Sequence, residues 1–227
     1  MKNKYLLILL VFFIFACSPY KKYAHTAASW ENEISSLEVK DDIESYSDQA
    51  VLFIGSSSIR LWDSINEDLA PYECIRRGYG GAHYTDLIHF TKRLVYPHNF
   101  RALCIFVAND ITGGEKDLTV PEVMKLAKEV VKTVRAKYPN VPIFEIAVTP
   151  TESRWKVWPT IQKLNAEMKA YCESNPNMYF IDPSEAYLGS NGLPRPELFR
   201  NDKLHQTEAG YDIWGAAIKK ELDKVLK

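Results

Sequence analysis

The sequence predicts an α/β fold, a three-layer α/β/α sandwich with a central, mostly parallel, five-stranded sheet. Five short apolar runs, flanked by Gly, Pro or polar residues, alternate with stretches whose apolar residues recur every three or four positions. Strands that alternate with helices form crossover units, and such units predict a parallel sheet covered on both faces. No repeat or internal linker interrupts the pattern, so we expect one domain over residues 26–227.

The expected strands are the five apolar runs, at residues 51–54, 72–75, 103–107, 143–148 and 178–181. Three apolar stripes of helical period lie within residues 123–134, 161–171 and 211–222. Pro121 suits the first turn of a helix that begins after Thr119, and Pro139 ends that helix.

The N-terminus has the pattern of an export signal. Lys2 and Lys4 precede an apolar run over residues 5–16, which is too short to span a bilayer but suits a signal peptide. A small residue directly before Cys17 is similar to a bacterial lipobox, which implies cleavage before Cys17 and acylation of its thiol. The alternative is a plain secretion signal with a chance cysteine. We therefore expect a signal peptide over residues 1–16, a tether over 17–25, and an exported protein that is lipid-anchored to the cell envelope or secreted.

Composition excludes several classes of function. The formal net charge is −1 and Lys and Arg form no run, so nucleic-acid binding has no electrostatic support. None of the four cysteines forms a C-x-x-C pair, and the signatures of P-loop nucleotide sites and zinc proteases are absent. We expect no cofactor and no metal. Cys104 lies inside an apolar run and is expected to be a buried free thiol.

Four polar segments lie where a parallel sheet binds ligands, beyond the carboxyl ends of its strands. Three follow the first three expected strands, at residues 55–60, 77–82 and 108–111, and the fourth, 202–205, precedes the last helix. Each alone is compatible with a turn, a helix cap or chance. Their order along the chain is more informative than any one of them.

In this order the four segments resemble the blocks of the GDSL/SGNH hydrolase family, in a subgroup that reads Gly-Ser-Ser-Ser-Ile-Arg in place of G-D-S-L. The resemblance covers about residues 30–220 and implies the flavodoxin-like fold of that family. Two positions depart from the pattern. Ser56 replaces the Asp of the family name, and Val107 stands where the third block usually has Gly.

The resemblance implies a role for each matching residue. Ser57 would be the nucleophile, His205 its general base, and Asp202 the carboxylate that orients the imidazole. The backbone N–H groups of Ser57 and Gly81 and the side-chain amide of Asn109 would form the oxyanion hole. Ser56 and Ser58, as turn residues, are the alternatives to Ser57.

The expected activity is that of a serine esterase that removes a short acyl group, such as acetyl, from a carbohydrate-type substrate through an acyl-enzyme. The alternatives are an acyltransferase to a sugar hydroxyl and a non-catalytic binding protein on the same fold. His83, Arg154 and Trp155 are candidates for substrate contact, with packing or ion pairing as the alternative role. The expected partners are a small ester or acylated glycan, and the membrane through Cys17. The polar stretches 149–158 and 182–206 predict a shallow rim without a long acyl tunnel.

Overall fold

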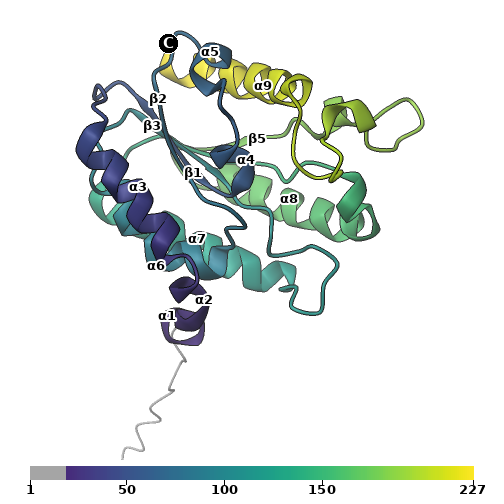
Figure 1. Ribbon diagram of the computed structural model, residues 1–227, viewed down its shortest axis with the longest axis horizontal. Coiled ribbons are helices and arrows are strands. Elements are labelled where there is room, and N and C mark those ends of the chain that lie inside the picture. The colour runs from purple at the N-terminus through teal and green to yellow at the C-terminus, as the bar shows by residue number, and fades with distance from the viewer. Residues whose placement is uncertain (1–18) are drawn as a thin grey trace, which may run out of the picture.

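The computed structural model describes residues 19–227 (Figure 1). The expected signal peptide and the expected lipidation site, Cys17, lie outside these residues. Within the described chain, no helix is both long enough and apolar enough to cross a membrane.

The centre of the molecule is a sheet of five parallel strands in the order β2-β1-β3-β4-β5. Their bounds are β1 Val51–Gly55, β2 Cys74–Gly78, β3 Ala102–Phe106, β4 Ile143–Ile146 and β5 Met178–Ile181. This is the doubly wound order of flavodoxin-like proteins. The predicted α/β sandwich with five strands is confirmed, and all four pairings are parallel.

The second strand lies further along the chain than its apolar run predicts. It was expected over residues 72–75 but runs from Cys74 to Gly78 and contains two arginines. Arg77 is buried there because Asp41 and Glu44 pair with its guanidinium, at 2.6 and 3.0 Å. Charged residues are rarely buried, so a strand that contains them has no continuous apolar run and is not found by a search for such runs.

Helices cover both faces of the sheet (Figure 1). One layer contains α6 Tyr84–Val95, α7 Val120–Lys137 and α8 Trp158–Glu173, which pack side by side. The other contains α4 Ser57–Arg60, α5 Ile65–Asp68 and α9 Glu208–Leu226. The three expected stripes lie on α7, α8 and α9. Thr119 caps α7 in a capping box with Glu122.

Short 3₁₀ segments occur in the loops beyond β4 and β5. They are η1 Glu152–Val157, η2 Ser184–Tyr187 and η3 Pro196–Leu198.

The N-terminal segment is helical, in α1 Pro19–Lys22, α2 Ala24–Ala28 and α3 Glu31–Ile43. Residues 19–25, expected as part of a tether, therefore contain α1, the cap residue Tyr23 and the start of α2. Tyr20 holds this segment against the domain: its ring meets His89 edge-on at 5.5 Å, and its hydroxyl lies 3.4 Å from Thr133 Oγ1. Cys74, Cys104 and Cys172 are free buried thiols, as expected for Cys104.

Candidate active site

Ser57 is the first residue of α4 and directly follows a sharp turn at the end of β1. Gly55 has φ +129°, and a Cβ at this position would overlap the carbonyl oxygen of Phe106 on the neighbouring strand β3. Only glycine fits such a conformation at such a close approach. Ser56 N then donates to Phe106 O at 2.9 Å, so the chain turns away from the sheet and presents Ser57 at its carboxyl edge.

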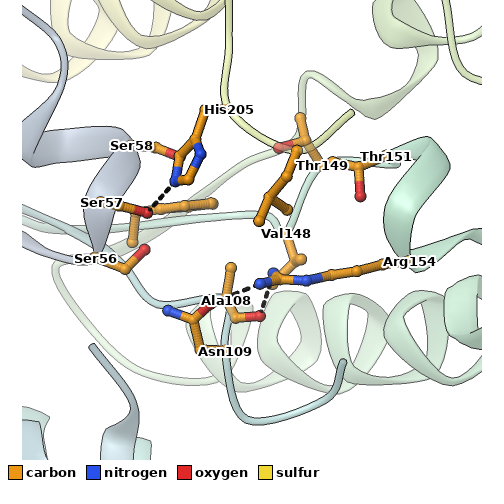
Figure 2. A pocket seen from close by; sticks show the side chains of 12 residues that line it. Ser56, Ser57, Ser58, Ala108, Asn109, Val148, Thr149, Thr151, Arg154 and His205 are labelled. Atoms are coloured by element: carbon orange, nitrogen blue, oxygen red, sulfur yellow. Dashed lines mark hydrogen bonds between the residues drawn. The ribbon is translucent and has the colours of Figure 1, made fainter. Parts of the chain in front are cut away.

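The hydroxyl of Ser57 contacts the imidazole of His205 (Figure 2). Ser57 Oγ lies 2.9 Å from His205 Nε2. Within the described chain, neither Ser56 nor Ser58 forms a side-chain hydrogen bond to this histidine. Ser56 is buried and precedes the first residue of α4, while Ser58 offers its backbone carbonyl to Tyr211. The geometry thus distinguishes Ser57 from the two serines beside it.

Asp202 and His205 lie on one tight turn. Asp202 Oδ1 accepts hydrogen bonds from the backbone N–H groups of Leu204 and His205, at 3.0 and 2.9 Å. Asp202 Oδ2 lies 2.6 Å from His205 Nδ1. Lys203 has φ +58°, a left-handed conformation that closes the turn. One carboxylate oxygen therefore shapes the backbone while the other orients the imidazole.

These contacts favour the ionised form of Asp202. Partial burial raises the pKa of this carboxyl, but the hydrogen bonds from the His205 ring and from two backbone N–H groups lower it by more. The net pKa of Asp202 is below its ordinary value. A carboxylate anion therefore faces Nδ1 of His205, which directs the lone pair of Nε2 towards Ser57.

In the described chain, each of the three expected oxyanion donors has a hydrogen that is available to another acceptor. Within the described residues, the backbone N–H groups of Ser57 and Gly81 are donated to no other protein group. Gly81 has φ +64°, which suits glycine. Asn109 Nδ2 donates to Ala82 O at 2.9 Å, which leaves its second amide hydrogen for another acceptor.

Arg154 reaches this site from η1 and is buried. Its Nη1 donates to Ala108 O and its Nη2 donates to Asn109 Oδ1, both at 2.6 Å (Figure 2). The guanidinium lines the pocket next to Ser57, but these two groups hold it in place. Contact of Arg154 with substrate stays a prediction.

The pocket beside Ser57 is small. Its volume is about 20 Å³, and Val148, Thr149 and Thr151 line the side opposite Ser57 (Figure 2). A single water-sized group needs roughly 10–15 Å³ on this measure. The pocket therefore has room for a group of about the size of a methyl.

The other two candidates for substrate contact lie outside this pocket. Trp155 is half-buried, and its ring stacks on Trp158 with centroids 6.1 Å apart. His83 caps α6 and borders a separate groove of about 570 Å³ that Trp30 and Tyr23 also line. Contact of Trp155 or His83 with substrate stays a prediction. No group of three or more metal-ligating side chains lies together within residues 19–227.

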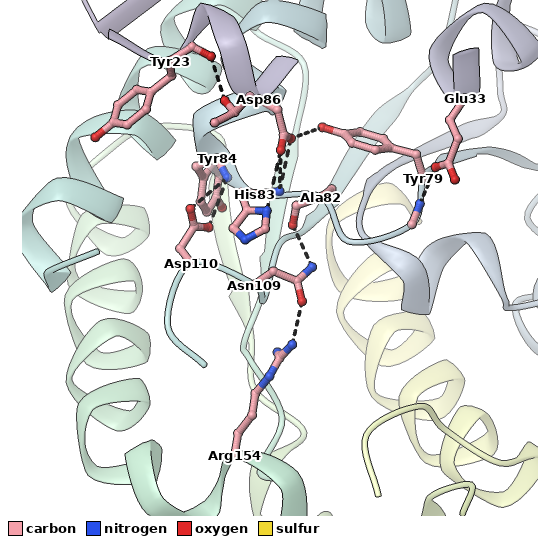
Figure 3. Close-up of polar contacts among 12 residues, drawn as sticks. Tyr23, Glu33, Tyr79, Ala82, His83, Tyr84, Asp86, Asn109, Asp110 and Arg154 are labelled. Carbon is pink, nitrogen blue, oxygen red and sulfur yellow. Dashed lines mark hydrogen bonds and ion pairs between the residues drawn. The ribbon is translucent and has the colours of Figure 1, made fainter. Parts of the chain in front are cut away.

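Two residues from α3 and its start hold the loop of Gly81 and were not expected from the sequence. Glu33 Oε2 accepts a hydrogen bond of 2.8 Å from Gly80 N (Figure 3). The ring of Trp30 covers Gly81, where a Cβ would come within 3.0 Å of it. Neither residue belongs to the four polar segments, and no local pattern marks them.

The model of the GDSL-like Lipase/Acylhydrolase family matches residues 57–213, more than half of the chain. The chain belongs to this family. The expectation of a hydrolase that acts on ester bonds is thereby confirmed for this GDSL-like acylhydrolase. A search of curated protein sequences found no match.

Solved structures share the fold of this GDSL-like acylhydrolase. A protein from Streptococcus pneumonia, assigned as a platelet activating factor, is 19% identical with a TM-score of 0.74, over 89% of this chain and 97% of that one. A carbohydrate esterase of family 3 from Talaromyces cellulolyticus is 14% identical with a TM-score of 0.61, over 78% and 97%. An acetyl esterase mutant with acetate ion is 15% identical with a TM-score of 0.58, over 78% and 97%.

Proposed function

We propose that this GDSL-like acylhydrolase is a serine esterase that removes a short acyl group, acetyl above all, from a carbohydrate-type substrate. The observation that carries the proposal is the continuous chain of contacts from Ser57 through His205 to Asp202, at 2.9 and 2.6 Å. A serine hydroxyl becomes a nucleophile when a base accepts its proton, and this arrangement supplies that base.

The reaction has two halves that use the same groups. In the first, Ser57 Oγ attacks the ester carbonyl carbon as its proton passes to Nε2 of His205. The tetrahedral intermediate collapses, and the imidazolium gives that proton to the departing alcohol oxygen, which leaves an acyl group on Ser57. In the second, water gives a proton to His205 and attacks the acyl carbon. The free acid departs and Ser57 regains its proton. The Asp202 carboxylate stabilises the imidazolium in both halves.

The carbonyl oxygen becomes negatively charged in each tetrahedral intermediate and needs donors. We assign this role to the backbone N–H groups of Ser57 and Gly81 and to the free amide hydrogen of Asn109. Their availability supports the assignment, because preorganised donors stabilise developing charge without reorganising during the reaction.

The small pocket supports a short acyl group. An acyl chain gains about 0.8 kcal/mol for each CH₂ that it buries, so a pocket with room for one methyl does not reward a longer chain. The carbohydrate part of the proposal is supported by the fold shared with a carbohydrate esterase.

We also propose that Cys17 carries a lipid anchor, on the strength of the apolar run and the small residue before it. Metabolic labelling with a fatty acid tests this in cells that express the full chain. Label on the protein that disappears in Cys17→Ala supports the anchor, and an unlabelled protein rejects it.

Hydrolysis of p-nitrophenyl acetate and of acetylated glycans by the full chain tests the proposed activity. Ser57→Ala should lower kcat by about 10⁴ or more. Ser56→Ala and Ser58→Ala are the matched controls and should keep most of the activity. Full activity in Ser57→Ala would reject the proposal. Acetyl found on an added sugar instead of in free acetate would indicate transfer in place of hydrolysis.

A further inference from the structure

Arg154 forms the only contact to the oxygen of the Asn109 amide that the described chain shows. The amide lies between two partners: Arg154 Nη2 donates to Oδ1 at 2.6 Å, and Nδ2 donates to Ala82 O at 2.9 Å (Figure 3). Arg154 reaches across 45 residues of sequence to make this contact.

The contact determines which end of the amide faces the site. A guanidinium has donors and no acceptor, so it can bond only to the oxygen of an asparagine amide. With Oδ1 facing Arg154, the NH₂ group must face the other way. One of its hydrogens goes to Ala82 O, and the other stays available on a residue that lines the pocket beside Ser57. A flipped amide would place NH₂ against a cation and oxygen against the Ala82 carbonyl.

Arg154 holds the backbone of the same loop as well as the side chain. Its Nη1 donates to Ala108 O, the carbonyl directly before Asn109. This loop is where Val107 replaces the glycine usual in the family block, so its path is not set by the usual residue. Two bonds from one rigid planar group restrain both the position of Asn109 and the rotation of its amide.

The positively charged guanidinium of Arg154 is buried. Within residues 19–227, no carboxylate lies within ion-pair distance of Arg154, and the residue is 8% exposed. Burial lowers the pKa of Arg154 to about 10, against the opposing effect of Asp117 and Asp110, so the group stays cationic at neutral pH. A cation on Oδ1 draws electron density from the amide and makes its N–H a stronger donor.

We infer that Arg154 is a positioning residue of the esterase, which orients and polarises the Asn109 amide so that its free N–H meets the oxyanion. The inference rests on the proposed function, because it gives Asn109 the oxyanion role assigned above. Arg154 itself does not touch the reacting atoms.

Kinetics of p-nitrophenyl acetate hydrolysis with the full chain test the inference through a double-mutant cycle. Arg154→Ala should lower kcat about 10- to 100-fold with KM little changed, because the oxyanion bond exists only in the transition state. In an Asn109→Ala background the same substitution should cost less than threefold, since no amide is left to orient. Arg154→Lys keeps the charge but reaches one acceptor, so its loss should be intermediate. If Arg154→Ala does not fold, Arg154→Lys replaces it in the double-mutant cycle with Asn109→Ala.

The matched control is Arg135→Ala. Arg135 also holds backbone carbonyls, those of Tyr138, Val141 and Asn177, but at the amino ends of β4 and β5. It should lower the melting temperature and leave kcat unchanged. Equal losses for Arg154→Ala with and without Asn109, or a loss of less than threefold in the otherwise unchanged chain, would overturn the inference. Inactive Ser57→Ala beside active Arg154→Ala would reject the inference alone, whereas active Ser57→Ala would reject the proposed function itself.

Discussion

The carboxylate of Glu33 accepts a hydrogen bond from the backbone N–H of Gly80, with 2.8 Å between Oε2 and the nitrogen. Gly80 directly precedes Gly81, whose own N–H has no acceptor within residues 19–227 and is the one to which we assign an oxyanion role. Helix α3 thereby holds the loop that carries this donor, although it lies 47 residues earlier in the chain.

Removing this acceptor should slow the reaction without blocking binding. In Glu33→Ala we expect kcat for p-nitrophenyl acetate to fall about tenfold, because a displaced Gly81 N–H meets the oxyanion poorly. Glu33→Gln keeps an acceptor and should stay close to the unchanged protein. Glu38→Ala is the control, because Glu38 lies on the same helix but pairs with Arg93. Equal rates in Glu33→Ala and Glu38→Ala would contradict the prediction.

Asp202→Asn should cause a large loss of activity although it preserves the turn. The asparagine oxygen can keep the two backbone bonds that Oδ1 now accepts, so its NH₂ would face Nδ1 of His205. That donor forces the imidazole hydrogen onto Nε2, where it cannot accept the proton of Ser57. We expect kcat to fall by about 10⁴ at neutral pH. Asp182→Asn is the control, because Asp182 also caps a turn, through Ser184 N. A loss below tenfold in Asp202→Asn would show that Asp202 does not set the tautomer.

The small pocket beside Ser57 should limit the length of the acyl chain that the protein cleaves. Along a series of p-nitrophenyl esters, kcat/KM should be highest for acetate or propionate and should fall steeply beyond butyrate. Val148 lines the pocket, so Val148→Ala enlarges it. The kcat/KM for butyrate relative to that for acetate should then rise several-fold, since each buried CH₂ is worth about 0.8 kcal/mol. Preference for octanoate in the unchanged chain would exclude the short-acyl proposal.

The stability of the fold should depend on pH through Glu145. This residue is buried in β4, where Tyr84 Oη donates to Oε2 at 3.1 Å. Burial raises the pKa of Glu145 from 4.5 to about 8, against the opposing bond from Tyr84. Between these values the folded chain keeps a proton that the unfolded chain has lost, so the free energy of unfolding should fall as pH rises from 5 to 8.

Urea denaturation of Glu145→Gln at pH 5 and pH 8 measures this contribution. The variant cannot titrate at this position, so it should lose less stability than the unchanged chain over this interval, by a few kcal/mol at most. The exposed Glu167→Gln should behave like the unchanged chain. Parallel pH curves for the unchanged chain and Glu145→Gln would show that Glu145 ionises freely in the fold.

The sequence predicts those parts of the fold and site that depend on local pattern. Apolar runs located the strands because buried parallel strands are apolar on both faces. Ser57 and the pair Asp202–His205 were predicted from short motifs, and the structure places these three side chains in contact. The prediction was least accurate at β2, where Arg77 is buried by partners from another segment.

Contacts between distant segments could not be predicted in this way. Glu33 reaches the Gly81 loop from α3, and Trp30 reaches it from the cap position before this helix. Only Ile34 and Leu37 of α3 are buried, so the helix shows no apolar stripe. Arg154 was considered for contact with substrate or for ion pairing. Its bond to Asn109 depends on how η1 folds over the end of β3, and no spacing in the sequence encodes that.

The segment η1 supports both halves of the site at once. Arg154 holds the loop of Asn109, while Ser153 N donates to Lys203 O and Glu152 pairs with the Lys203 ammonium at 2.5 Å. Lys203 lies inside the turn of Asp202 and His205. This six-residue segment therefore contacts both the loop of Asn109 and the turn that carries His205. We therefore expect insertions between β4 and α8 to disturb both together. Insertions at the exposed residues 190–193, which an antiparallel bridge between Leu188 and Pro194 encloses, should disturb neither.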